Sequence, residues 1–315
     1  MDFDYQVLDE TEKIIFALRS LYQSYGYNRY RMGKFEEYDL YSRNKDFLVS
    51  DAVITFTDTD GKLMALKPDV TLSIIKNDKD HKGSLRKLCY NESVYRVSKG
   101  TNSFKEIMQT GLECIGEVTA ENIREVLLLA GKSLSLLSGE YILEISGLEI
   151  ISLLISGIVK EEAVINRILK LLGERNRHGM LELLRERDIP EKSKEMLLKI
   201  PELIGTPDQV IRTLEELIDE NHPENEEPVR LEISFLKEVL KDFEDQDVYR
   251  HMILDFSLVS DRNYYNGITF KGFISGIPES VLSGGRYDRL MEKMGRRSKA
   301  VGFAVYLDLL ERLSV

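Results

Sequence analysis

The sequence predicts an α+β fold in which an antiparallel sheet flanked by helices is interrupted by a helical subdomain. Aromatic and β-branched runs typical of strands lie in two regions, at about residues 27–145 and 251–302. Between them, residues 159–245 form short, charged, amphipathic segments with helical spacing. We therefore expect residues 1–158 and 246–315 to form one sheet domain into which residues 159–245 are inserted.

The composition is typical of a globular protein and excludes several classes of function. The chain has 315 residues, of which 43% are hydrophobic, and carries a net charge of −11. That charge repels phosphate, and no stretch concentrates Lys and Arg, so we expect no nucleic-acid partner. No apolar run reaches the ~18 residues that span a bilayer. The acidic N-terminus lacks the apolar core of a signal peptide. We predict a cytoplasmic protein with no membrane partner.

Cysteine and histidine spacing predicts no metal site and no cofactor. The two cysteines, Cys89 and Cys114, fall on predicted strands, where small buried residues are the expected interpretation. The four histidines are scattered without a ligand-type spacing.

The N-terminal part opens with a helix and continues into strands. Asp9 and Glu12 form a capping box, and Gly26 ends the helix. An Asp- and Gly-containing turn at residues 58–61 predicts a hairpin. The expected strands cover residues 27–41, 52–57, 63–66, 85–97 and 104–116.

The remaining elements follow the same reasoning. Residues 121–137 are expected to form a helix, residues 141–145 a strand, and a further helix starts at Leu148. Beyond the insertion we expect strands at 251–259, 264–273, 280–282 and near 300–302, and helices at 287–294 and at the end of the chain.

The strand at residues 107–115 carries polar side chains where a core is expected. With period two, Gln109, Gly111 and Glu113 share one face. A buried carboxylate needs a partner, and Gly111 leaves room for a ligand over the sheet. An amide and a carboxylate suit a ligand that bears an ammonium or imidazole group. A solvent-facing strand or an internal hydrogen-bond network is the alternative interpretation.

Three further segments could line a site, each with a simpler alternative. Tyr264 and Tyr265 precede an Asn-Gly turn and could orient a polar ligand, or could pack on the sheet. Residues 283–288, Ser-Gly-Gly-Arg-Tyr-Asp, join a strand to a helix and could bind an anion or make a close packing contact. Asp69 and Thr71 could equally cap a helix. No Walker loop, zinc signature or dinucleotide fingerprint is present.

Taken together, these segments resemble histidyl-tRNA synthetase, and the resemblance covers essentially the whole chain. It implies a class II aminoacyl-tRNA synthetase-like sheet. The matching segments, in chain order, are Thr55–Thr71, Val94–Gly116 (motif 2), Leu258–Phe270 and Leu282–Leu290 (two histidine-specific motifs), and Ala300–Leu313 (motif 3).

The resemblance implies a pocket for histidine. Asp69 and Thr71 fall where the family binds the amino group. Gln109 and Glu113 match residues that hold the substrate histidine. Tyr264 and Tyr265 match the tyrosines around the imidazole, and Arg96 matches the arginine of motif 2. The Gly-rich strand end that closes the pocket is matched by Gly284, Gly285 and Arg286.

The catalytic apparatus of the family is not retained, so we expect no catalytic residue. Ser260 stands where the family has an essential arginine, and Arg262 is displaced by two positions. In motif 3, Leu309 follows Tyr306, Leu307 and Asp308, and the ATP-binding arginine is lost. The motif 2 loop has Ser98 in place of Glu and offers only Lys99 and Lys105. The resemblance stops at motif 3, and we expect no anticodon-binding domain.

This pattern resembles a paralogous family, the synthetase-like regulatory subunits that accompany short-form ATP phosphoribosyltransferase. The resemblance implies a non-catalytic subunit that activates a catalytic partner, binds histidine, transmits feedback inhibition in histidine synthesis and dimerises through the sheet domain. A stand-alone histidine-activating ligase and a free histidine-sensing module are the alternatives.

Overall fold

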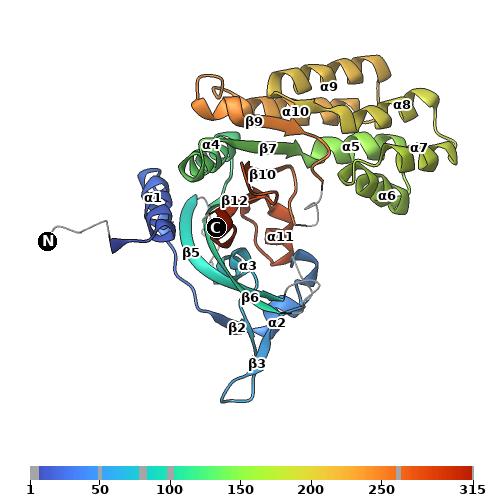
Figure 1. Cartoon of the computed structure of the whole chain (residues 1–315). Coiled ribbons are helices and arrows are strands. Elements are labelled where there is room, and N and C mark those ends of the chain that lie inside the picture. Colours follow the sequence, from blue (N-terminus) through green and yellow to red (C-terminus); the bar gives the residue numbers. More distant parts are fainter. Residues whose placement is uncertain (1–6, 49–51, 78–83, 98–102, 260–263, 314–315) are drawn as a thin grey trace. The chain divides into compact units, whose positions relative to one another are not determined.

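The computed structural model describes residues 7–48, 52–77, 84–97, 103–259 and 264–313. The chain divides into two compact units, one formed by Met1–Tyr141 with Gly272–Val315 and the other by Ile142–Lys271. The interval 159–245, expected as a helical insertion, lies inside the second unit, which also includes strands on either side of it. Figure 1 shows the elements of both units.

The first unit begins with helix α1 (Glu10–Ser24), as predicted. The Asp9 carboxylate accepts the Glu12 backbone N–H, and the Glu12 carboxylate accepts the Asp9 N–H, which completes the capping box. Gly26 follows with φ +84°, a left-handed conformation that favours glycine after a helix.

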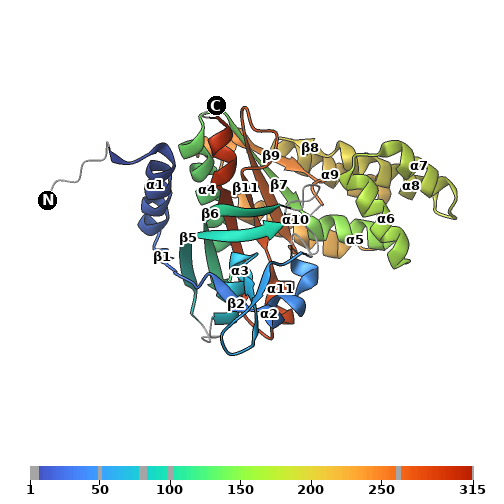
Figure 2. The ribbon, with the colours of Figure 1, turned by 60° about the horizontal axis from the view of Figure 1, so that its bottom comes forward.

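Five strands of the first unit lie side by side in the order β1-β5-β6-β12-β11. Their bounds are β1 (Asn28–Arg29), β5 (Arg86–Val97), β6 (Phe104–Gly116), β11 (Leu282–Arg286) and β12 (Lys299–Tyr306). The β5–β6, β6–β12 and β12–β11 pairs are antiparallel, as expected, whereas the short edge strand β1 pairs with β5 in parallel. Figure 2 shows β5 and β6 running side by side.

One side of this sheet is covered by α1 and α4 (Ala120–Leu137). The buried Tyr22 of α1 shares a hydrogen bond with Ser133 of α4 at 3.0 Å and packs edge-on against Phe303 of β12, with ring centroids 5.9 Å apart. Because alternate residues of a strand face opposite sides, Gly302 and Ala304 face the other side of the sheet.

A smaller sheet in the order β2-β4-β3 belongs to the same unit, with strands β2 (Phe35–Glu37), β3 (Thr55–Thr57) and β4 (Leu63–Leu66). The predicted hairpin is confirmed: the Asp58 side chain accepts the N–H groups of Asp60 and Lys62 in the turn between β3 and β4. Helix α3 (Val70–Asn77) follows β4.

The prediction of strands from residue 27 to about residue 41 holds only for β1 and β2, because residues 30–34 form no strand and residues 38–42 are helical. Residues Tyr38–Ser42 form helix α2, followed by the 3₁₀ turn η2 (Lys45–Phe47). The helix buries Tyr41, whose hydroxyl shares a hydrogen bond with Ser73 of α3 at 3.3 Å. A tertiary contact therefore overrides the strand preference of the aromatic residues.

A second correction concerns the Ser-Gly-Gly-Arg segment. Ser283, Gly284 and Gly285 lie within strand β11 and do not form the joint between a strand and a helix. Helix α11 (Asp288–Lys293) begins only after Tyr287, and β12 is followed by the 3₁₀ helix η5 (Leu307–Leu313). The glycines therefore do not present a helix N-terminus to an anion.

The second unit combines helices with the strand order β10-β7-β9-β8, formed by β7 (Tyr141–Gly147), β8 (Ile204–Gly205), β9 (Met252–Asp255) and β10 (Ile268–Ile274). Strands β7 and β9 pair in parallel, and the long helical segment is the crossover between them. Its helices are α5 (Leu148–Ile158), α6 (Glu162–Gly173), α7 (Arg177–Arg185), α8 (Glu191–Lys199), α9 (Pro207–Asn221) and α10 (Glu226–Leu240), with 3₁₀ turns η3 (Ile200–Glu202) and η4 (Asp247–His251).

Candidate functional site

The predicted polar residues of β6 lie on the side of the first unit's sheet opposite α1 and α4. Residues directly opposite in antiparallel strands point to the same face. One row across this face contains Leu88, Glu113, Gly302 and Gly285. The row two residues along contains Tyr90, Gly111, Ala304 and Ser283, and the next contains Glu92, Gln109 and Tyr306. The face therefore has a floor of small residues between polar side chains.

Glu113 is a buried carboxyl group held by two hydroxyl groups. Thr71 donates to Oε1 at 2.7 Å, and Tyr287 donates to Oε2 at 2.6 Å. Burial raises the pKa of Glu113 to about 8; the two hydroxyl donors oppose this shift, and the nearby charge of Asp69 adds to it. A Cβ at Gly302 would lie 1.8 Å from Glu113 Oε2, so only glycine fits beneath this carboxyl group.

Gln109 is a buried amide with an unused donor. Its side chain is only 3% exposed, and its Nε2 atom has no hydrogen-bond partner among the described residues. A buried amide N–H without an acceptor costs free energy, about 1–3 kcal/mol. An acceptor atom on a bound ligand would remove that cost.

The prediction that Gly111 leaves room for a ligand is wrong. Tyr90 lies opposite Gly111 on β5, and its hydroxyl oxygen is 2.6 Å from the point that a Cβ at Gly111 would occupy. The neighbouring aromatic side chain fills the space that glycine leaves, a pairing that single-strand periodicity cannot reveal.

Asp69 and Thr71 come to the site from the start of α3. The Asp69 carboxylate accepts the Leu72 backbone N–H at 2.8 Å, so this residue caps the helix. Thr71, in the first turn of the helix, donates to Glu113. The capping role and a place beside Glu113 therefore coexist in this segment.

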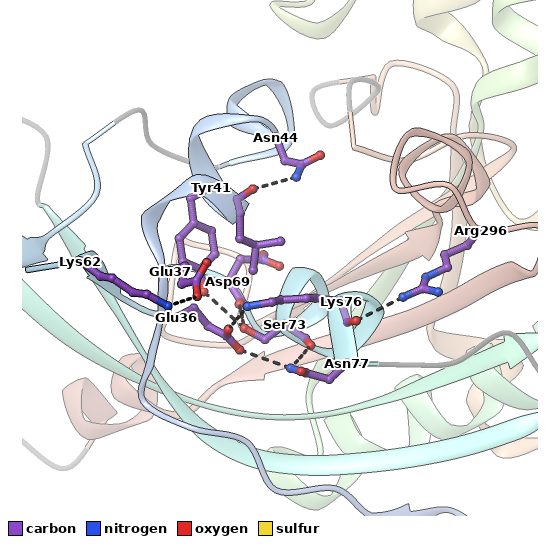
Figure 3. A network of polar contacts seen from close by, with 11 residues as sticks. Glu36, Glu37, Tyr41, Asn44, Lys62, Asp69, Ser73, Lys76, Asn77 and Arg296 are labelled. Atoms are coloured by element: carbon purple, nitrogen blue, oxygen red, sulfur yellow. Dashed lines mark hydrogen bonds and ion pairs between the residues drawn. The ribbon is translucent and has the colours of Figure 1, made fainter. Parts of the chain in front are cut away.

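A polar network fixes α3 at its other end (Figure 3). The buried Glu36 carboxylate of β2 accepts Lys76 Nζ at 2.6 Å and Asn77 Nδ2 at 3.3 Å. Asn77 also donates to the Ser73 carbonyl, and Arg296 donates to the Lys76 carbonyl at 3.2 Å. Because both ends of this short helix are tied down, the position of Thr71 is well defined.

The predicted arginines occupy different faces. Arg96 lies on the same face of β5 as Glu92 and donates from Nε to the Pro68 carbonyl at 3.1 Å, next to Asp69. Arg286 pairs with Val301, on the face opposite Glu113, and forms an ion pair with Asp288 at 2.6 Å. Gly284 likewise alternates away from Gly285, which shares the row of Glu113.

The two predicted tyrosines belong to the second unit. Tyr264 and Tyr265 pack edge to face with ring centroids 4.8 Å apart and precede β10. Ser98, Lys99, Ser260 and Arg262 lie outside the described residues. Lys105 is exposed near the start of β6.

The sequence did not assign Tyr306, Glu92 and Lys67 to a site, and it included Tyr287 only within the candidate segment 283–288. Tyr287 binds Glu113, and the Tyr306 hydroxyl shares a hydrogen bond with Ser283 Oγ at 2.8 Å. Glu92 accepts Lys67 Nζ at 3.0 Å. Lys67 is fully buried, and burial lowers the pKa of its amine. The register between neighbouring strands determines which of these side chains meet. This register cannot be read from the order of residues along one strand.

This arrangement offers both a donor and an acceptor to a small polar ligand. Glu113 suits a ligand N–H group, and Gln109 suits a ligand acceptor such as a carboxylate oxygen. Among the described residues, no cluster of three or more His, Cys, Asp or Glu side chains could hold a metal ion. No helix in the described part of the chain is long and apolar enough to cross a membrane. The two cysteines are buried on β5 and β6, as expected, and burial raises the pKa of both thiols.

Comparison with known proteins links this geometry to a family. Residues 2–310 match the family model described as histidyl-tRNA synthetase. The ATP phosphoribosyltransferase regulatory subunit of Acetivibrio thermocellus is 29% identical over 301 residues, which cover 93% of this chain and 70% of that protein. The protein of the same name from Caldanaerobacter subterraneus subsp. tengcongensis is 29% identical over 295 residues, with coverages of 92% and 75%.

Solved structures confirm the predicted fold class. A structure from Bacillus halodurans, described as an ATP phosphoribosyltransferase regulatory subunit/histidyl-tRNA synthetase, has a TM-score of 0.83 at 25% identity and covers 99% of this chain and 82% of that one. Histidyl-tRNA synthetase from Nostoc has a TM-score of 0.79 at 16% identity, with coverages of 100% and 75%. A chain of the Thermotoga maritima ATP phosphoribosyl transferase (HisG:HisZ) complex has a TM-score of 0.66 at 18% identity, with coverages of 96% and 98%. The last two likenesses concern the fold alone.

Proposed function

The chain belongs to the histidyl-tRNA synthetase family, and on that premise we propose that it is a non-catalytic regulatory subunit of ATP phosphoribosyltransferase that binds histidine. The curated relatives carry that subunit name and align with more than nine-tenths of the chain. The catalytic partner joins ATP to phosphoribosyl pyrophosphate in the cytoplasm, at the first step of histidine synthesis.

One observation carries the ligand assignment. Gln109 presents a buried amide N–H without an acceptor among the described residues, on the same face as the hydroxyl-bound carboxyl group of Glu113. A histidine would supply a carboxylate oxygen to Gln109 and a nitrogen to Glu113. Asp69 lies near Glu113 and suits the α-amino group, and Thr71 completes the set of predicted residues beside this carboxyl group.

The residues present support binding without activation. Formation of an aminoacyl adenylate places negative charge on phosphate oxygens, which synthetases stabilise with cations. Here the matching positions hold Ser260 and Leu309, so the sequence lacks two of those cations. The subunit therefore senses histidine and performs no chemistry on it.

Regulation requires histidine to distinguish two states of the assembly. A ligand shifts an equilibrium only by its difference in affinity between the two states. We propose that the subunit activates its catalytic partner, dimerises through the sheet domain, and favours a less active assembly when histidine is bound.

The test is to assay a short-form catalytic subunit from the same host with and without this chain, across a histidine titration. We expect activity that depends on the chain and falls as histidine rises. The Gln109→Leu variant should still activate but should need at least tenfold more histidine for inhibition, because it lacks the donor to the ligand carboxylate.

Two results would contradict the proposal. A catalytic subunit that is neither bound nor activated by the chain would remove the regulatory role. Histidine-dependent exchange between ATP and pyrophosphate would instead identify a ligase.

A further inference from the structure

The Gln109 row of the site is closed on both sides by side chains that hydrogen bonds hold in place. Glu92 lies opposite Gln109 on β5 and is bound by the buried Lys67 at 3.0 Å. Tyr306 lies opposite Gln109 on β12 and shares its hydroxyl with Ser283 at 2.8 Å. A ligand group that accepts the Gln109 N–H therefore lies between these two walls.

The Tyr306 ring crosses the small-residue floor. Ser283 pairs with Ala304, two residues from Tyr306 on β12. To reach Ser283, the tyrosine must lean diagonally from β12 toward β11, beside Ala304. Tyr306 and Gly302 are four residues apart, about 13 Å along an extended strand. Because Tyr90 covers Gly111, the floor between this ring and the Glu113 carboxyl group is limited to Ala304 and Gly302 on β12.

From this geometry we infer that Tyr306 is a specificity-determining residue: locked by Ser283, it closes the site at the ligand's carboxyl end and restricts it to free amino acids. This inference rests on the proposed function, because it takes histidine as the ligand. Amino acids extended at the carboxyl group, such as amides, dipeptides and adenylates, would overlap the tyrosine ring.

The polarity of the site sets this orientation. Gln109 Nε2 is a donor without an acceptor among the described residues, so it selects the ligand carboxylate. Glu113, at the other end of the floor, selects a ligand nitrogen. The carboxylate therefore lies in the row of Tyr306, and any group attached to it must displace one of the two walls.

Tyr306 is the weaker of those walls. The Lys67 side chain is fully buried and forms an ion pair with Glu92, whose side chain is 15% exposed, so the Glu92 wall is held by charge. Tyr306 and Ser283 are both only half-buried and are joined by one hydrogen bond between uncharged groups. Removal of the Tyr306 ring is therefore the change that should open the site with least damage to the fold. The Tyr306 ring also keeps a second reactant away from the ligand carboxylate, as expected for a protein that binds histidine without reacting with it.

The test is calorimetric titration of the full-length chain with histidine, histidine amide and the dipeptide His-Gly. We compare wild type with Tyr306→Ala, Tyr306→Phe and Tyr95→Ala. Tyr95 is the control because it lies on the opposite face of β5, where it donates to Glu106. Thermal unfolding of each variant establishes that it is folded.

We expect Tyr306→Ala to improve the affinity for His-Gly relative to histidine by at least tenfold, with a smaller gain for Tyr306→Phe and none for Tyr95→Ala. Because the comparison is a ratio between variants, the chemical differences between the ligands cancel. An unchanged ratio in a folded Tyr306→Ala variant that binds histidine would overturn the inference alone. A wild-type chain that binds no histidine would overturn the proposed function and the inference with it.

Discussion

At the scale of single residues, Glu113 gives the site its pH dependence. The carboxyl group is held by the Thr71 and Tyr287 hydroxyls, and burial raises its pKa to about 8. In the unfolded chain its pKa lies near the ordinary value of 4.5. Between these values the folded chain retains a proton that the unfolded chain has released, so stability falls as pH rises through this window.

The Glu113→Gln variant should lack this dependence. We expect the free energy of unfolding of wild type, relative to the variant, to fall between pH 5 and pH 8. The fall should approach ~1.4 kcal/mol for each unit of pH over which the folded chain holds the extra proton. Urea denaturation at the two pH values measures the difference. Parallel pH profiles for the two chains would show that the carboxyl group titrates normally.

Thr71 should contribute stability through the same carboxyl group. Thr71→Val is nearly isosteric and removes the donor to Glu113 Oε1, so we expect a loss of about 1–3 kcal/mol of unfolding free energy. Thr213→Val is the matched control, because the exposed Thr213 hydroxyl donates only to a carbonyl of its own helix; its effect should stay within ~0.5 kcal/mol. Equal effects in chemical denaturation would argue against a special role for Thr71.

At the scale of elements, α3 depends on the network in Figure 3. Glu36→Gln removes the charge that pairs with Lys76 at 2.6 Å. Because Lys76 is 37% exposed, we expect a moderate loss of about 1–2 kcal/mol in urea denaturation. Glu224→Gln breaks the Lys160–Glu224 pair of similar length, 2.7 Å, which is about 65% exposed; it should cost less than ~0.5 kcal/mol. If the two variants lost equal stability, the network would not anchor α3.

The elements that the sequence predicted correctly are those with local signals. The signals for the Asp9–Glu12 capping box, the turn at residues 58–61 and the long strands β5 and β6 lie within short stretches of sequence. Helix α2 was missed because Tyr41 becomes helical only when it packs against Ser73 of α3. Strand β11 was predicted to end too early, since two glycines resemble a turn until β12 pairs with them.

The candidate site shows the same limit. Period two correctly placed Gln109 and Glu113 on one face, because that information lies within one strand. It wrongly left space above Gly111, which Tyr90 fills from β5. The partners Tyr287 and Tyr306 depend on the register of β11 and β12 against β6. Contacts between residues on neighbouring strands are thus the part of a site that cannot be predicted from a single sequence.

At the scale of the whole molecule, binding of histidine should stabilise the folded chain. A ligand that binds only the folded state adds RT ln(1 + [L]/Kd) to its stability, about 2.7 kcal/mol at a hundredfold excess over Kd. For a chain of 315 residues this should raise the calorimetric unfolding midpoint by a few degrees. Imidazole alone, which lacks a carboxylate for Gln109, should give a smaller shift at the same concentration.

The Gln109→Leu variant separates specific binding from a general solute effect. The substitution removes an amide N–H that has no partner among the described residues, so the free variant should be at least as stable as wild type. The same change removes the donor to the ligand carboxylate, so at the same concentration histidine should raise the midpoint of the variant by at most about half as much. A residue that is unfavourable for stability and required for binding is the expected property of a ligand site. An equal midpoint shift in wild type and variant would place the histidine elsewhere in the molecule.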